Sequence, residues 1–296
     1  MTQRIAFVDT HVHFYDFSHP SLRWDWLRPG SAPAETIGEY GAIQAYRYVA
    51  EDFLAETRFQ NVECVVHVQA ALGSADPVEE TRWLQAQADA TGVPEGIVAH
   101  ASLDAPDLDA TLVRHAQCAN LRAVRDLRYD GYLSSPDWLR GLDVLERHGL
   151  MLCDDPLVEH MALLAAAARE HPALTICVDH AGFPRRRDDV YFREWRAGME
   201  AISRRPNTVV KISGLGMCDH RWTLESIRPW VRSCLELWGP ERAFFGTNWP
   251  VDRLFSSYGD VLDAYLELIS DFSPGERAAL FSGNAKRLFA LGARQS

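Results

Sequence analysis

Three histidines lie where strand-like runs of the chain end, and imidazole is the side chain that can bind metals or accept protons near neutral pH. His11 and His13 follow the run RIAFVDT with one residue between them, so the two-residue period of a strand places both on the same side. His180 closes the run ALTICVDH in the same way. Three neutral imidazoles in one place suit a zinc-type divalent ion, with a further anionic ligand or water completing about four positions.

Other strand-like runs also end in polar side chains. His67 and Gln69 end one run with the same spacing as the first histidine pair, and Arg125 ends another. The planar guanidinium of arginine suits a carboxylate or a vicinal diol, so we expect these three residues to orient a substrate. The alternative for Arg125 is a structural salt bridge to Asp126 or Asp154.

The elements that would position these side chains recur along the whole chain. Short apolar or β-branched runs occupy residues 4–10, 62–70, 96–102, 121–127, 149–153, 173–180, 207–214 and 242–248. Most are continuous rather than alternating, which is typical of strands buried on both faces. Amphipathic segments of helical length separate them. Eight such units predict a single domain over residues 1–296 with a (β/α)₈ TIM barrel fold, and the alternative is a doubly wound open sheet with an appendage.

One segment departs from this regularity. Residues 14–46 are rich in Trp, Pro, Gly and Ser, and they separate the first strand from a helix expected at 47–59. Such a loop, which makes the barrel irregular, would lie over the catalytic end as a lid or rim. Trp24 and Trp26 would either stack on a ligand or pin the loop to the barrel.

Two further motifs have structural interpretations. Asp155-Pro156 predicts the start of a helix, with the aspartate as its N-cap and proline in the first turn. Arg185-Arg186-Arg187 is followed directly by two aspartates, which predicts a solvated loop with no assigned role.

Composition limits the partners and the compartment. The 296 residues carry a net charge of −11, which repels phosphate backbones and argues against nucleic acid. The longest apolar run, residues 161–168, is far shorter than the ~20 residues of a membrane span. The first residues do not resemble a signal peptide, so we expect a cytoplasmic protein. The six cysteines show no C-x-x-C spacing and are expected as reduced core residues. A homo-oligomer is left open.

These motifs together resemble the amidohydrolase superfamily, and within it the amidohydrolase 2 group that includes sugar lactonases and pyrone-dicarboxylate lactonase. The resemblance covers nearly the whole chain. It rests on DTHVHFYD near the start, HVQA at 67–70, VRDL around Arg125, VDHAGFP at 178–184, FFGTNWPVDRL at 244–254 and GNAKRLF at 283–289.

The resemblance implies that His11, His13 and His180 bind a metal or polarise a substrate carbonyl. It also implies an aspartate after the eighth strand that binds metal and activates water, but this chain has Asn248 there. An amide oxygen can coordinate a metal, yet it cannot accept a proton at neutral pH. The sequence is therefore compatible with one divalent ion or with a metal-free site.

Three residues are candidates for the general base that Asn248 cannot be. Asp252 lies four residues further on, Asp179 precedes His180, and His180 itself is the third. Strand alternation predicts that Asp179 points away from the barrel mouth, which favours Asp252. The structural alternative for Asp252 is a helix cap or a pair with Arg253. Trp249, beside this group, would form a wall of the pocket.

These observations predict a hydrolase that opens a small cyclic ester, with a sugar-acid lactone as the substrate class that the resemblance implies. Such a reaction needs a polarised carbonyl, a deprotonated water and groups that hold the substrate. The alternatives are a metal-dependent decarboxylase of the same superfamily and a non-catalytic barrel that binds a small ligand.

Overall fold

The computed structural model describes residues 5–31 and 35–292, and its centre is a barrel of eight parallel strands. The strands are β1 (Phe7–Val12), β4 (Val62–Val68), β5 (Gly96–His100), β6 (Leu121–Arg125), β7 (Met151–Asp154), β8 (Ile176–Val178), β9 (Thr208–Ile212) and β10 (Ala243–Phe245). Each pairs with the next in this order, and a bridge between Val12 and Trp249 joins the first strand to the segment after the last. The predicted TIM barrel and all eight of its strands are confirmed.

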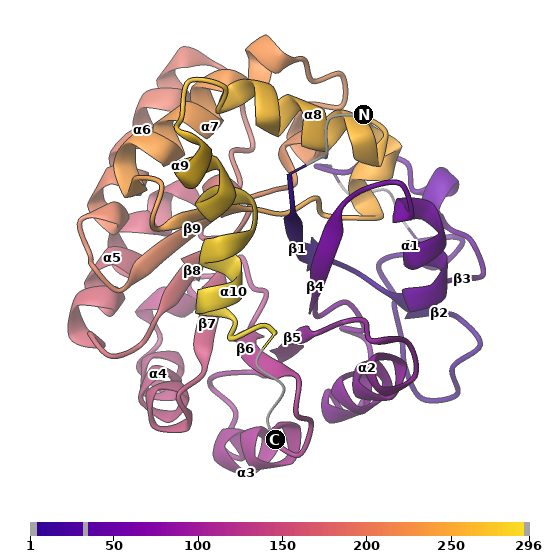
Figure 1. Cartoon of the computed structure of the whole chain (residues 1–296). Helices are drawn as coiled ribbons and strands as arrows, with labels where there is room; N and C mark the ends of the chain where they lie inside the picture. The colour runs from indigo at the N-terminus through magenta and orange to yellow at the C-terminus, as the bar shows by residue number, and fades with distance from the viewer. Residues whose placement is uncertain (1–4, 32–34, 293–296) are drawn as a thin grey trace.

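A helix follows each barrel strand, and together these helices surround the barrel (Figure 1). They are α1 (Ala50–Thr57), α2 (Val78–Thr91), α3 (Leu108–His115), α4 (Pro136–His148), α5 (Met161–Glu170), α6 (Asp189–Ser203), α7 (Leu224–Trp238) and α8 (Tyr258–Leu268), followed by the short α9 (Pro274–Ala278) and α10 (Asn284–Leu288). Within the described ranges, none of these helices is long and apolar enough to cross a membrane.

The strands are apolar on both faces because they separate two cores. Side chains such as Val66, Val98 and Phe244 form the core inside the barrel, while their neighbours in sequence pack outward against the helices. Five of the six cysteines are buried, as predicted, and Cys218 is half-buried. Strand alternation therefore decides which polar side chains near the strand ends face the barrel axis.

The amino-terminal end of the barrel is covered by the end of the chain. Phe289 and Leu291, after α10, belong to the same apolar cluster as the inner strand residues. The ring of Phe289 lies 5.9 Å from that of Phe244, and Figure 1 shows α10 crossing this end. The carboxyl-terminal end is the one left for a ligand.

The described parts of the irregular segment, residues 14–31 and 35–46, pack over that carboxyl-terminal end. Two short strands, β2 (Tyr15–Asp16) and β3 (Arg47–Tyr48), pair at its base, and a 3₁₀ turn spans Gly41–Ile43. The indole of Trp24 is fully buried and donates to the carbonyl of Phe14, which pins the segment to the barrel. The indole of Trp26 donates to the carbonyl of Ala70, and its ring borders the cavity described next.

Candidate active site

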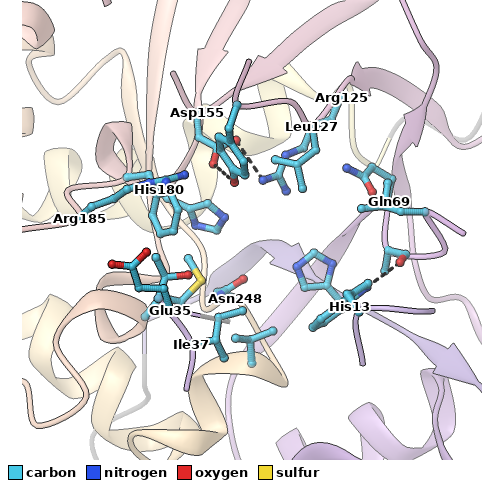
Figure 2. A pocket seen from close by; sticks show the side chains of 18 of the residues that line it. His13, Glu35, Ile37, Gln69, Arg125, Leu127, Asp155, His180, Arg185 and Asn248 are labelled. Carbon is cyan, nitrogen blue, oxygen red and sulfur yellow. Dashed lines mark hydrogen bonds and ion pairs between the residues drawn. The ribbon is translucent and has the colours of Figure 1, made fainter. Parts of the chain in front are cut away.

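A cavity of about 390 Å³ opens at the carboxyl ends of the strands. Its polar lining includes side chains from five different strand ends, namely His13, Gln69, Arg125, His180 and Asn248 (Figure 2). Much of the remaining wall is apolar or aromatic. The structure thus brings together five of the residues selected from the sequence, whereas His11, His67, Trp249 and Asp252 do not line the cavity.

The three histidines of the predicted centre lie next to one another. The ring of His11 is centred 4.3 Å from that of His180 and 4.9 Å from that of His13. Burial lowers the pKa of His13 to about 4, and it lowers those of His11 and His180 well below the usual range. Nearby cations, Arg125 among them, act in the same direction. All three imidazoles are therefore neutral at pH 7, which is the form that accepts protons or binds metals.

His180 reaches the cavity through an unusual backbone conformation rather than through strand alternation. Strand β8 ends at Val178, and His180 adopts the left-handed region with φ of 52°. Its Nδ1 lies 3.0 Å from the Ser213 hydroxyl. A Cβ at Gly214 would come within 2.6 Å of that nitrogen, so only glycine leaves room for the ring there. The loop after β9 thus fixes the orientation of His180.

The same geometry corrects the expected orientation of Asp179. Cys177 belongs to the core inside the barrel, so alternation directs Asp179 to the axis as well, and not away from the site. Its Oδ2 lies 3.8 Å from Nδ1 of His11, and its side chain is fully buried. Strand alternation predicts that the His180 side chain, and not that of Asp179, points toward the barrel axis. In the structure, the turn after β8 determines where His180 points.

Two cations hold Asp179 ionised. Nζ of Lys211 lies 2.9 Å from its Oδ1, and Nε of Arg125 lies 3.9 Å from its Oδ2. Burial alone would raise the pKa of Asp179, but Lys211 and Arg125 together bring it below its ordinary value. A buried carboxylate held in this way stabilises positive charge and is a weak proton acceptor.

Arg125 pairs with Asp155 and Asp179 and not with Asp126 or Asp154, the two partners expected for a structural salt bridge. Its guanidinium donates to Oδ1 of Asp155 at 3.1 Å, and the Tyr129 hydroxyl donates to Oδ2 of the same carboxylate at 3.1 Å. Asp155 is therefore a partner of the arginine rather than a helix cap, and α5 begins only at Met161. Asp154 instead accepts from the Tyr132 hydroxyl at 2.8 Å.

The two residues chosen at the end of β4 have different environments. Gln69 follows the strand and lines the cavity, and neither polar atom of its buried amide has a partner among the described residues. His67 alternates with Val66 and Val68, which face the barrel axis, so its ring packs outward against Phe14 at 5.4 Å. The structure places Gln69, but not His67, within reach of a ligand.

A buried glutamate holds the loop that carries Gln69. The carboxylate of Glu80, in the first turn of α2, accepts from the backbone N–H groups of Ala70 and Ala71 at 2.8 and 2.9 Å. Burial raises the pKa of Glu80 from 4.5 to about 7. The folded protein therefore binds this proton more tightly than the unfolded chain does.

This shift predicts a measurable pH dependence of stability. Because the folded pKa is raised, ionisation of Glu80 costs folding free energy as the pH rises from 4.5 to about 7, by about 3 kcal/mol in total. Glu80→Gln removes the ionisation, so we expect its free energy of unfolding, relative to the parent protein, to rise between pH 5 and pH 8. Urea unfolding of the parent and the variant at pH 5 and at pH 8 measures these free energies. The same difference between the two proteins at both pH values would contradict a raised pKa for Glu80.

The segment after β10 places its three candidate residues differently. Asn248 has a left-handed backbone with φ of 60° and lines the cavity, where its Nδ2 has no partner among the described residues. Trp249 is buried behind it, and its indole donates to Glu56. Asp252 lies among apolar side chains outside the cavity, and burial raises its pKa well above the ordinary value.

The donor types of the three histidines suit a divalent cation, although among the described residues their nitrogens do not form a group within 4.8 Å of one another. Both ring nitrogens of His11 and Oδ2 of Asp179 are buried without a hydrogen-bond partner among the described residues. His13 uses Nδ1 to contact the Val68 carbonyl at 2.9 Å, which leaves its Nε2 for a ligand. Asp179 also lies within 4.8 Å of the Cys153 and Cys177 thiols, but burial raises the pKa of Cys177. The neutral imidazoles are thus the better donors.

Sequence reasoning missed three residues of this site. Lys211 could have been found, because a charged residue interrupts the β-branched run NTVVKISG of a strand expected to be buried on both faces. The proline after Asp155 predicts a helix N-cap, and this pattern hides the ion pair that Asp155 makes with Arg125. Arg185, which borders the cavity, was obscured by the two arginines and two aspartates after it.

The chain is similar to known proteins over nearly its whole length. The chain is 37% identical to the uncharacterized protein y4mH of Sinorhizobium fredii, with 96% of this chain and 98% of the relative covered. It is 29% identical to an L-fucono-1,5-lactonase of Burkholderia ambifaria, with 96% and 95% covered. A crystal structure of a zinc-bound amidohydrolase from Burkholderia multivorans superposes with a TM-score of 0.83 at 25% identity, covering 97% and 99%. The model of the amidohydrolase family matches residues 8–291, and the chain belongs to that family.

Proposed function

We propose that this protein is a lactonase that opens a small cyclic ester by adding water to its carbonyl group. The observation that carries the proposal is the neutral, oriented imidazole of His180 in the same cavity as Arg125, Gln69 and Asn248. Relatives named L-fucono-1,5-lactonase support the same reaction class. Sugar-acid lactones, with L-fucono-1,5-lactone first, are therefore the substrates to test.

In this proposal His180 is the general base. When Nδ1 donates to the Ser213 hydroxyl, Nε2 carries the lone pair and can take a proton from water. The water oxygen then bonds to the lactone carbonyl carbon, and the ring C–O bond breaks. The imidazolium returns its proton to the leaving alkoxide, which yields a hydroxy acid. Asp179 near His11 and His180 provides negative charge that stabilises the transient imidazolium.

The remaining polar groups of the cavity would bind the reacting ester. The amides of Gln69 and Asn248 offer N–H donors that have no hydrogen-bond partner among the described residues, as expected for groups that meet a carbonyl or a developing oxyanion. Arg125 adds positive charge beside them. Asp252 lies outside the cavity, so we assign it no contact with the substrate.

A divalent ion is part of the proposal. His11 and His13 would hold it together with Oδ2 of Asp179, which leaves His180 as the base, and the ion would polarise the carbonyl and acidify water when bound. We expect protein dialysed against Zn²⁺ to retain about one equivalent of metal. His11→Asn combined with His13→Asn should abolish this retention, as measured by elemental analysis. Equal retention by the parent and double variant would contradict the assignment.

Acid release tests the proposed reaction directly. Purified protein, with and without added Zn²⁺, is incubated with a panel of 1,4- and 1,5-aldonolactones, and ring opening is followed with a pH indicator. Turnover of at least one lactone above the buffer rate supports the proposal. If no lactone is opened and CO₂ is released from an aromatic carboxylate instead, the decarboxylase alternative replaces it.

A further inference from the structure

One arginine that lines the cavity, Arg185, has no carboxylate partner among the described residues. The other cavity arginine, Arg125, is paired with Asp155 and Asp179. For Arg185, the described residues provide neither an ion pair within 4.0 Å nor a hydrogen bond to the guanidinium, and its Nε is buried without a partner. An unpaired guanidinium in a largely apolar cavity is suited to bind an anionic group of a ligand.

The guanidinium of Arg185 is held in place by aromatic rings. Its central carbon lies 4.4 Å from the ring centre of Tyr129 and 4.8 Å from that of Phe183. Such contacts with the ring faces fix the plane of the group and leave the N–H donors at its edge available. Tyr129 is also the residue that donates to Asp155, so the arrangement is continuous with the Arg125 network. Figure 2 shows Arg185 beside His180, at the same side of the cavity.

The apolar side chains of the cavity limit what the rest of the ligand can be. Ile37, Leu127, Met217 and Val251 line the cavity together with the ring of Trp26. A lactone with hydroxyl groups on every carbon would leave several of them against these side chains without hydrogen bonds, which costs binding free energy. A compact apolar ring with one charged substituent matches both features.

We propose that Arg185 selects a lactone that bears a carboxylate substituent on an otherwise apolar body, and that this carboxylate binds the Arg185 guanidinium. This inference rests on the proposed lactonase reaction, and it replaces sugar-acid lactones as the preferred substrates with anionic lactones that carry few hydroxyl groups. The carboxylate in question is part of the substrate before ring opening, and it is separate from the one that hydrolysis creates near His180. Arg125 positions the reacting ester, and Arg185 favours anionic lactones over neutral ones.

Glu35 is the residue that competes with such a ligand. Its carboxylate lines the same cavity, is exposed, and is not within ion-pair distance of Arg185. It lowers the positive potential at the rim without neutralising the guanidinium. Removal of this charge, in Glu35→Gln, is therefore expected to strengthen the preference for an anionic lactone by about twofold to threefold.

The test compares two lactones of equal shape and different charge. Phthalide-5-carboxylate and its primary carboxamide differ only in the substituent, and hydrolysis of both is measured over a range of concentrations. We expect the parent protein to favour the carboxylate in kcat/KM by at least about tenfold. Arg185→Gln should reduce this ratio to about one, mainly through KM, and Arg185→Lys should keep part of it.

Arg186→Gln is the matched control, because it removes the same charge from the adjacent residue. Arg186 is exposed, pairs with Asp188 and does not line the cavity, so its variant should keep the parent ratio within about twofold. Equal ratios in the parent and Arg185→Gln, or equal losses in both glutamine variants, would overturn the proposal.

A binding measurement separates this inference from the reaction itself. Phthalide-5-carboxylate is titrated calorimetrically into the parent protein and into Arg185→Gln. If no lactone of either charge is hydrolysed but the carboxylate binds in an Arg185-dependent manner, the lactonase proposal fails and the anion site stands. If neutral lactones are hydrolysed and the carboxylate gains nothing from Arg185, only the anion site fails.

Discussion

Replacement of His180 by asparagine is expected to reduce kcat for lactone hydrolysis by ~10²–10⁴, the usual contribution of a general base. The side chain loses its proton-accepting Nε2, while an amide can still contact Ser213. The loss should fall on kcat rather than on KM, because the other polar groups that line the cavity remain. Steady-state kinetics on the best substrate of the lactone panel provides the measurement.

His115→Asn is the control for this prediction. His115 is also a buried histidine with two hydrogen bonds, to Thr81 at 2.8 Å and to the His100 carbonyl at 3.1 Å, but it is the last residue of α3 and does not line the cavity. Its variant should lose stability and retain kcat. A His180→Asn enzyme within threefold of the parent kcat would remove His180 from the role of base.

Loss of the Asp179 carboxylate should produce the largest stability effect in the molecule. Both Asp179 and Lys211 are fully buried, and their side chains lie 2.9 Å apart. Asp179→Asn leaves the Lys211 ammonium without a carboxylate inside the barrel, which costs about 3–5 kcal/mol for a buried pair broken on one side. Urea unfolding, monitored by circular dichroism, measures the change in the free energy of unfolding.

The double variant distinguishes a broken ion pair from simple loss of packing. Lys211→Met added to Asp179→Asn removes the unpaired ammonium and keeps much of the lysine volume, so it should recover part of the lost stability. Arg125 retains Asp155 as a partner in either background. Additive destabilisation by the two substitutions would show that the two groups do not stabilise each other.

The fold could be predicted from the sequence because its signal is repeated along the chain. Eight continuous apolar runs separated by amphipathic segments reflect strands that are buried on both faces, and the structure has a strand that overlaps each run. Element boundaries were less certain. The helix expected from residue 156 begins at Met161, because Asp155 is bound to Arg125 and Tyr129 rather than to a helix N-terminus.

The site could be predicted only where a side chain follows the periodicity of its strand. Arg125 shares the parity of the inward-facing Ala123 and lies at the cavity. His67 and Gln69 share one parity, but His67 points outward, whereas Gln69 follows the end of β4 and lines the cavity. His180 and Asn248 depend on left-handed backbone conformations, with φ of 52° and 60°, that no spacing rule indicates for these residue types. The contact of Lys211 with Asp179 depends on the register between the neighbouring strands β8 and β9.

The covered floor of the barrel has a kinetic consequence. Phe289 and Leu291 close the amino-terminal end of the barrel with apolar side chains. In the part of the chain that the structure describes, residues 5–31 and 35–292, the cavity therefore opens to solvent at the carboxyl-terminal end. Substrate, water and the ring-opened acid must then share one passage. The product has to depart before another substrate molecule enters, so it should inhibit competitively, and turnover of a tightly held acid would be limited by its departure rather than by bond cleavage.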